Sequence, residues 1–101
     1  MKHHAHGTVV IVGASIAGLL AAAAVAGRYQ RVILLDRDAL PETPVLRKGA
    51  PQGAHVHGLL EHGQRALEKL LPGIIDEVIS AGGGLGDLLA EGLFYIGTQR
   101  L

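Results

Sequence analysis

Two stretches decide the fold of this chain: Thr8-Val9-Val10-Ile11-Val12-Gly13-Ala14-Ser15-Ile16-Ala17-Gly18 and, further on, Val32-Ile33-Leu34-Leu35-Asp36. In the first, a short apolar run enters a glycine turn. An alanine-rich segment follows, for which we predict a helix over residues 16–26. The second stretch is another apolar run, and it ends in a carboxylate. The order strand, glycine turn, helix, strand and acid is typical of a βαβ unit that binds a dinucleotide.

Each conspicuous residue of this unit has a physical role in that interpretation. Gly13 permits the tight turn from strand to helix, and Gly18 lets the helix lie close against the strand. The N–H groups around Ile16 and Ala17, at the positive end of the helix dipole, would face a pyrophosphate.

Two further positions bear on the ligand. Asp36 is placed to accept hydrogen bonds from a ribose hydroxyl. Ser15 departs from the fingerprint, which has a second glycine at this position so that the backbone can approach the pyrophosphate. Serine is small and its hydroxyl can donate to a phosphate oxygen, so we expect a weakened site. The alternative is a βαβ unit with a tight turn and no ligand.

Composition excludes several classes of protein. The 101 residues are 49% hydrophobic and 18% charged, which predicts one small globular domain at most. Nine basic and nine acidic side chains balance, and this argues against nucleic acid or an anionic membrane as the main partner. With no cysteine there is no disulfide framework and no cysteine-based metal site. We predict no membrane span and no signal peptide, hence a cytoplasmic location.

The division of the chain follows from the same pattern. Residues 1–7, with three histidines, are interpreted as a disordered or tag-like lead. Both apolar runs are continuous, as in parallel strands that are covered on both faces. Two strands and one helix cannot cover both faces of a sheet. We therefore interpret residues 8–101 as the N-terminal part of a larger FAD- or NAD(P)-binding α/β domain, completed by the rest of an enzyme or by another chain.

The remainder is expected to be a loop and then helices. Residues 37–58 are rich in proline and glycine and leave the carboxyl end of the second strand, the ligand edge of an open α/β sheet. Apolar residues at spacings of three and four predict a helix over 59–71, with Glu61 facing Arg65. Pro72 and Gly73 interrupt it, residues 74–79 form a second apolar stripe, and residues 82–84 end that stripe. Residues 94–96 are a candidate third strand.

The loop carries a resemblance. Leu46-Arg47-Lys48-Gly49-Ala50-Pro51-Gln52-Gly53-Ala54-His55-Val56-His57-Gly58-Leu59-Leu60 resembles a segment of FAD-dependent monooxygenases with the aromatic-hydroxylase fold, most closely the bacterial branch that includes polyene epoxidases. The span from Thr8 to about Gly84 is similar to the N-terminus of those enzymes. Their second cofactor motif, a Gly-Asp pair, lies far downstream; Gly86-Asp87 has the letters but comes too early.

The resemblance implies that the cofactor is FAD, with NADPH or NADH as the reductant. Gly13, Ser15 and Gly18 would then hold the pyrophosphate and Asp36 the adenosine ribose. The enzyme would transfer one oxygen atom from O2, through a flavin hydroperoxide, to a small apolar organic substrate. No catalytic residue is identified in this segment.

Three loop residues are candidate cofactor ligands. Arg47 matches an arginine of the family that reaches back toward the cofactor, and the alternative is a solvated cation. Arg37 follows the acid directly and is a candidate for the same nucleotide. Gln52 would bond either the cofactor or the loop backbone.

The pair His55 and His57 has alternate spacing, which would place both rings on one side of an extended segment. Loop packing or ordinary hydrogen bonding is the main interpretation, ahead of a cofactor- or substrate-facing role. We predict no metal, because no carboxylate or thiol lies at ligand spacing nearby.

Two other functions stay open on sequence alone. The βαβ unit does not separate FAD from NAD, so an NAD(P)-dependent dehydrogenase or reductase is the alternative enzyme. Asp36 disfavours a 2′-phosphate, although Arg37 and Arg47 leave NADP open. The third interpretation is a non-catalytic remnant, or a subunit that associates through an exposed strand edge.

Overall fold

The computed structural model describes residues 6–93 and 95–100, and its first unit is the expected βαβ arrangement. Strand β1 (His6–Val12) leads to helix α1 (Ile16–Val25), which returns to strand β2 (Tyr29–Leu35). The strands are parallel, with Thr8 opposite Arg31 and Val12 opposite Leu35. Thus the α/β class and the parallel βαβ unit are confirmed. Residues 1–5 of the predicted lead lie outside the described residues, and β1 already includes His6 and Gly7.

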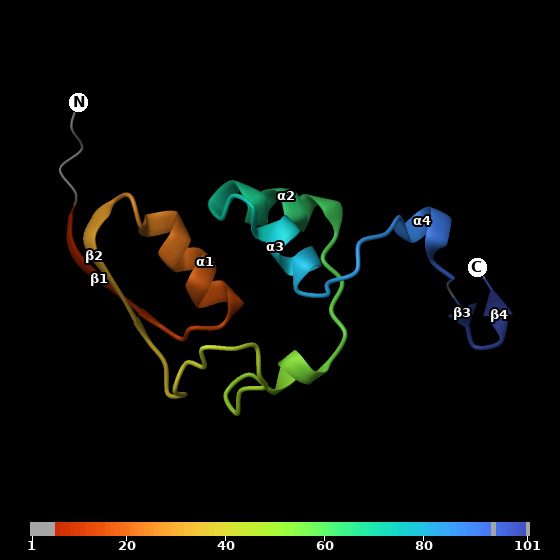
Figure 1. Ribbon diagram of the computed structural model, residues 1–101, viewed down its shortest axis with the longest axis horizontal. Coiled ribbons are helices and arrows are strands. Elements are labelled where there is room, and N and C mark those ends of the chain that lie inside the picture. The colour runs from red at the N-terminus through yellow and green to blue at the C-terminus, as the bar shows by residue number, and fades with distance from the viewer. Residues whose placement is uncertain (1–5, 94, 101) are drawn as a thin grey trace.

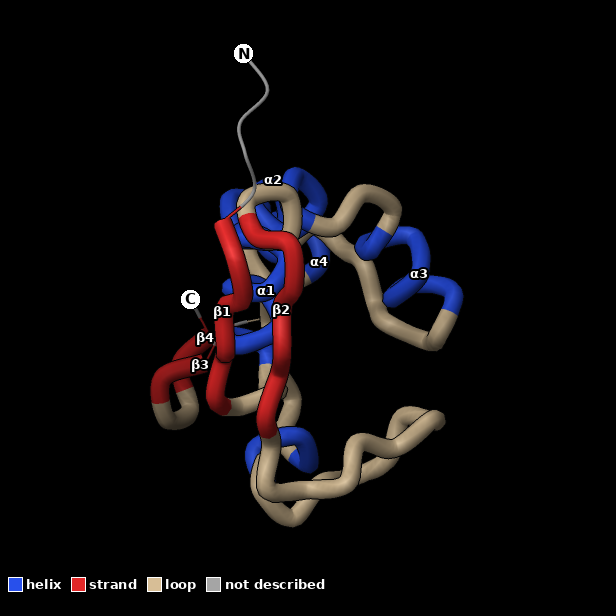
Figure 2. Tube along the Cα trace, turned by 90° about the vertical axis from the view of Figure 1, so that its left-hand side faces the viewer, coloured by secondary structure: helices blue, strands red, loops and turns tan. Residues whose placement is uncertain are grey.

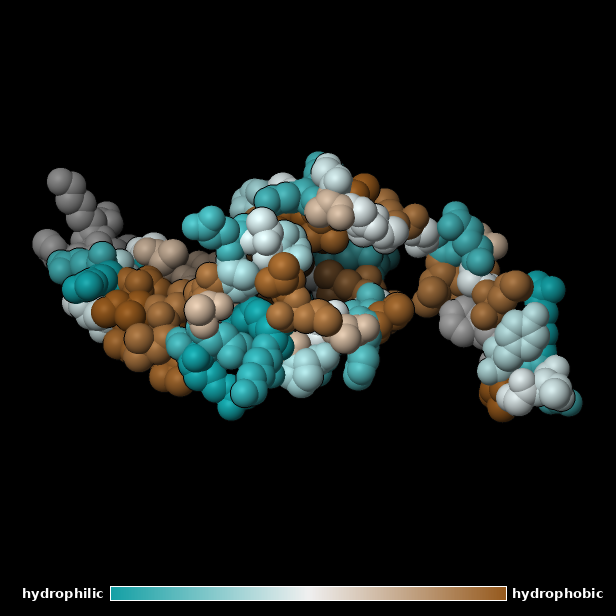
Figure 3. Space-filling model, turned by 60° about the horizontal axis from the view of Figure 1, so that its bottom comes forward, coloured by the Kyte–Doolittle hydropathy of each residue, from teal (hydrophilic) through white to brown (hydrophobic). Residues whose placement is uncertain are grey.

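Helix α1 lies against one face of this small sheet, while the other face is open. Figure 2 shows the strands in front of α1, with the uncovered face toward the viewer. Val10, Val12 and Leu35 on that face are 51%, 84% and 51% exposed. The brown surface over the strands in Figure 3 is apolar. Within residues 6–93 and 95–100, Ala14 is the only buried hydrophobic residue.

The middle of the chain is a loop with one short helical turn, η1 (Pro51–Ala54), followed by two helices, α2 (Glu61–Leu70) and α3 (Ile74–Ser80). The predicted helix over 59–71 is shorter at both ends. Leu60 is extended, and the Gln64 side chain bonds the carbonyl of Leu59. At the other end Leu71 leaves the helical region, as residues before proline tend to do. The predicted Glu61–Arg65 pair forms on the exposed surface.

The connection between α2 and α3 contains a contact that the sequence did not suggest. The carboxylate of Glu68, on α2, accepts hydrogen bonds from the N–H groups of Gly73 and Ile75. It therefore caps the start of α3, whose N-cap residue Gly73 is left-handed, with φ of 87°. Asp76 and Glu77 occupy the first turn, where carboxylates interact favourably with the positive end of the helix dipole. Gly82, with φ of 103°, ends the helix.

The C-terminal part forms a separate small group. The N-cap residue of helix α4 (Leu88–Glu91) is Asp87, whose Oδ1 accepts hydrogen bonds from the N–H groups of Leu89 and Ala90. Asp87 is thus a helix cap here. Strands β3 (Tyr95–Ile96) and β4 (Gln99–Arg100) pair as an antiparallel hairpin and not with β1 or β2. Tyr95 and Ile96 are therefore a strand, as predicted, while Phe94 lies outside the described residues.

The βαβ unit, the α2–α3 pair and the C-terminal group follow one another along the long axis of the molecule, as Figure 1 shows. The radius of gyration is 17.6 Å, whereas a compact domain of about 100 residues has a radius near 13 Å. The extents are 58 × 36 × 25 Å. Among the described residues, no helix is long and apolar enough to cross a membrane. The elongated form and the uncovered sheet face agree with the expectation that two strands and one helix do not make a complete layer structure.

Candidate functional site at the carboxyl edge of the parallel strands

The turn between β1 and α1 forms one wall of the site. Gly13 has φ of 100°, a conformation that L side chains rarely adopt. Its N–H donates to the Leu35 carbonyl at 2.7 Å, which ties the turn to the end of β2. A Cβ at Gly18 would lie 1.7 Å from the Gly13 carbonyl oxygen, so the first turn of α1 passes directly over the glycine turn. The roles predicted for both glycines in chain geometry are thereby confirmed.

The start of α1 supplies unpaired donors. The backbone hydrogen bond from Leu19 N–H reaches the carbonyl of Ser15, and the N–H groups before Leu19 have no acceptor within the helix. Ser15 is the N-cap residue, but its side chain makes no capping hydrogen bond. Ile16 and Ala17 are exposed. This end of the helix is therefore open toward an anion.

Asp36 follows β2 and faces the turn. Its Oδ2 accepts the N–H of Ala14 at 2.7 Å, and its Oδ1 accepts the N–H of Asp38 at 2.8 Å. Arg47 Nη2 lies 2.9 Å from the same Oδ2. The bonds from Ala14, Asp38 and Arg47, in that order of weight, lower the pKa of Asp36 from 3.8 to about 2. The carboxylate is thus held ionised by the protein itself.

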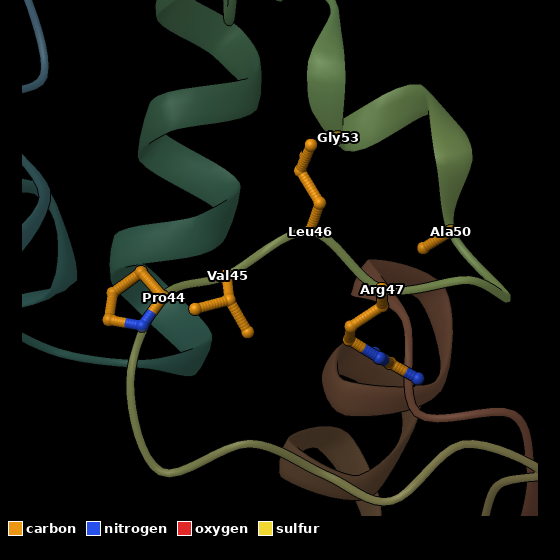
Figure 4. Close-up of a pocket in the computed structure, with 6 residues that line it drawn as sticks. All are labelled: Pro44, Val45, Leu46, Arg47, Ala50 and Gly53. Atoms are coloured by element: carbon orange, nitrogen blue, oxygen red, sulfur yellow. The ribbon is translucent and has the colours of Figure 1, made fainter.

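Arg47 returns to the βαβ unit from the far side of the loop. Its Nη1 donates to the Ala14 carbonyl at 2.7 Å, and its Nε lies 3.6 Å from Asp38 Oδ2. Figure 4 shows its side chain turned toward the start of α1, whereas Leu46 points toward η1. A hollow of about 380 Å³ lies on that side of the loop and includes Pro44, Val45 and Leu46 in its lining. Arg47 therefore lies beside the βα turn and Asp36, and its predicted reach toward a cofactor stays a prediction.

These residues enclose an open pocket of about 440 Å³. Its lining consists of Val12, Gly13, Ser15, Leu35, Asp36, Arg37, Arg47 and Gly49. Five of the positions singled out from the sequence therefore meet there: Gly13, Ser15, Asp36, Arg37 and Arg47. Gly18 does not line the pocket but packs against the Gly13 turn. The meeting point is the carboxyl end of both strands, which is the ligand edge of such sheets.

Other candidates lie elsewhere. Gln52 is exposed in η1, away from the pocket lining, and its carbonyl accepts the N–H of His55. His57 Nδ1 lies 2.8 Å from the carbonyl oxygen of His55, and both residues are exposed. In the described part of the chain, no three His, Asp or Glu side chains are grouped to hold a metal ion. Asp38 and Gly49 belong to the site although sequence reasoning passed over both.

A comparison with curated proteins finds Protein Rv3254 of Mycobacterium tuberculosis (strain ATCC 25618 / H37Rv), which is 41% identical over 81 residues. The match covers 80% of this chain but 16% of that protein, so the chain spans a small part of its relative's length. No family model matches the sequence, and no solved structure matches it. Because the relative's name states no activity, the function has to be argued from the site.

Proposed function

We propose that this chain binds the adenosine and pyrophosphate part of FAD, and that it is a segment of an FAD-dependent monooxygenase. One observation carries the proposal: the open start of α1, the Asp36 carboxylate and the Arg47 guanidinium converge on one pocket at the strand ends. This combination of donors for phosphate and acceptor for ribose is the chemistry that a dinucleotide requires.

The residues present fit that ligand. The Gly13 turn leaves the α1 N–H groups accessible, and the Ser15 hydroxyl is exposed and makes no cap bond. Asp36 Oδ1 accepts one N–H, from Asp38, and a carboxylate oxygen can accept a second hydrogen bond. Arg37 lines the pocket and is exposed, so its guanidinium is available to a phosphate oxygen. We infer that Ser15, Asp36 and Arg37 contact the nucleotide.

Bound FAD would supply the oxygen-transfer chemistry, with NADH or NADPH as the source of electrons. The residues of this chain would hold and orient the adenine half of the cofactor. Residues that touch the apolar substrate would belong to the rest of the enzyme or to another chain, which would also cover the open face of the β1–β2 sheet. Two observations support this division. The pocket lies at the start of α1, and among the described residues one face of the β1–β2 sheet is uncovered.

A nicotinamide nucleotide is the alternative ligand, and one observation favours testing it. Arg37 forms no hydrogen bond or ion pair among the described residues and faces the pocket that contains Asp36. An arginine beside the ribose acid accommodates a 2′-phosphate in NADP-binding sites. An NAD(P)-dependent reductase is therefore the second candidate.

Titration of the purified chain tests both candidates. We expect FAD to bind, measured by calorimetry and by the change in flavin fluorescence, and NAD and NADP to bind weakly or not at all. Asp36→Asn should weaken FAD binding, whereas Asp76→Asn, in the first turn of α3 and away from the pocket, should leave it unchanged. A chain with a dispersed NMR spectrum that binds none of the three nucleotides would refute the proposal. Preference for NADP would promote the second candidate.

A further inference from the structure

Asp38 joins the beginning of the loop after β2 to its return segment near Gly49. Its backbone N–H donates to Asp36 Oδ1 at 2.8 Å, a short-range bond that turns the chain just after β2. Its own Oδ2 accepts the N–H of Gly49 at 2.8 Å. The Asp38 side chain is 15% exposed. The carboxylate therefore ties the beginning of the loop to its return segment.

Gly49 shows how closely these two segments approach. A Cβ at this position would lie 2.5 Å from Asp38 Oδ2 and 3.2 Å from Arg37 Nε. Its φ is not left-handed, so a side chain at this position would displace the Asp38 carboxylate and would not strain the backbone. The close approach keeps the Asp38 carboxylate on the inner side of the loop, next to Arg47.

One nitrogen of the Arg47 guanidinium, Nε, makes no hydrogen bond. Nη1 donates to the Ala14 carbonyl and Nη2 pairs with Asp36. Nε is buried without a hydrogen bond, and Asp38 Oδ2, 3.6 Å away, is the opposite charge beside it. At that separation the interaction is electrostatic and not a hydrogen bond. Asp38 thus lies beside the Nε edge of the guanidinium, while Ala14 and Asp36 bind its Nη1 and Nη2 atoms.

We propose that Asp38 is the positioning residue of the nucleotide site: its negative charge holds the Arg47 guanidinium against the βα turn. The proposal rests on the proposed function. It assigns Asp38 no contact with the nucleotide and no part in the reaction. Without the charge, the Arg47 guanidinium would be held only through its Nη1 and Nη2 atoms, and the pocket wall that it forms with Asp36 would loosen.

The variant Asp38→Asn separates charge from shape. Asparagine keeps an oxygen that can accept the Gly49 N–H, so a purely structural role in the loop would survive the substitution. Glu42→Gln is the matched control, because it removes a carboxylate from the same loop at an exposed position that forms no hydrogen bond or ion pair among the described residues. Both variants are compared with the unaltered chain by FAD titration and by NMR of the arginine Nε–H groups. The Arg47 signal is identified by its absence in Arg47→Lys.

In the unaltered chain we expect the buried Arg47 Nε–H to exchange slowly with water. Asp38→Asn should accelerate that exchange and weaken FAD binding by roughly fivefold to tenfold, while Glu42→Gln changes neither. Unchanged exchange in Asp38→Asn would overturn the proposal. Faster exchange with unchanged FAD affinity would overturn the role in binding. If the unaltered chain binds no FAD, faster exchange would still establish the orienting contact, and the proposed function alone would fail.

Discussion

Arg47 Nη2 and Asp36 Oδ2 lie 2.9 Å apart, and this pair fastens a loop of irregular structure to the end of a strand. The same guanidinium donates to the Ala14 carbonyl, while Ala14 N–H donates to Asp36. Turn, acid and arginine therefore form a closed set of hydrogen bonds. The acid is both a candidate ribose ligand and a structural tie, and substitutions at the site will disturb binding and loop order together.

The first prediction concerns acid pH. The folded-state pKa of Asp36 is lowered from 3.8 to about 2, so the carboxylate stabilises the fold above 3.8 and that contribution is lost as pH falls through about 2. Asp36→Asn should therefore be less stable than the unaltered chain at pH 5, with the difference vanishing toward pH 2. Thermal unfolding followed by circular dichroism at several pH values checks this. A difference independent of pH would argue against the lowered pKa.

A second prediction concerns Arg47 itself. Arg47→Ala should raise the pKa of Asp36 toward its ordinary value and lower the melting temperature, because a partly buried carboxylate loses its countercharge. The titration midpoint of the Asp36 carboxyl carbon, followed by NMR, measures the first effect. Arg65→Ala is the control. Its ion pair with Glu61 is exposed, and exposed pairs contribute about 0.5 kcal/mol or less.

Gly18 allows a test of the turn. Gly18→Ala would place a methyl group 1.7 Å from the Gly13 carbonyl oxygen, so α1 must shift away from the turn. We expect destabilisation of about 1–3 kcal/mol or more and loss of nucleotide binding. Gly27→Ala is the matched substitution, since nothing lies within 4 Å of its Cβ position and its φ is not left-handed. Equal effects of the two substitutions, measured by thermal unfolding, would contradict this account.

The helix pair offers a prediction that is independent of the nucleotide. Glu68→Ala removes the acceptor for the N–H groups of Gly73 and Ile75, and should cost about 1 kcal/mol, as the loss of a helix cap does. Hydrogen exchange of these two amides should accelerate, while the amides of α1 keep their rates. The stability of Glu68→Gln, which retains an amide oxygen as acceptor, should lie between that of the unaltered chain and that of Glu68→Ala. Unaltered exchange at Gly73 would show that the cap does not stabilise α3.

The βαβ unit could be predicted from the sequence because its two signals, the glycine turn and the apolar runs, are each contained in a few neighbouring residues. Gly13 lies in a turn that requires a positive φ, and Gly18, in the first turn of α1, has no room for a Cβ against Gly13. The order of two apolar runs around an alanine-rich segment is typical of a βαβ unit. The helix starting at Glu61 was predicted two residues too early, since Leu59 and Leu60 match the apolar spacing, whereas Leu60 is extended and Leu59 lies outside the helix.

Contacts between distant residues were harder to foresee. The resemblance to monooxygenases predicts that Arg47 reaches toward a cofactor, but it does not predict the contacts of Arg47 with Ala14 and Asp36. Asp38 lies in a loop with no periodicity, and its pairing with Gly49 depends on how that loop closes. Tyr95 was identified as strand, whereas its hairpin partner Arg100 was not, because two-residue strands carry too little pattern.

The link from Arg47 to the Ala14 carbonyl joins residues 33 positions apart, and so it closes a large ring of chain. Closing such a ring costs conformational entropy that grows slowly with its length. A nucleotide that contacts both the α1 start and Arg37 would form a second link between the βα turn and the loop that follows β2. Its binding would then report on the ordering of the loop, with a rise in melting temperature that depends on ligand concentration.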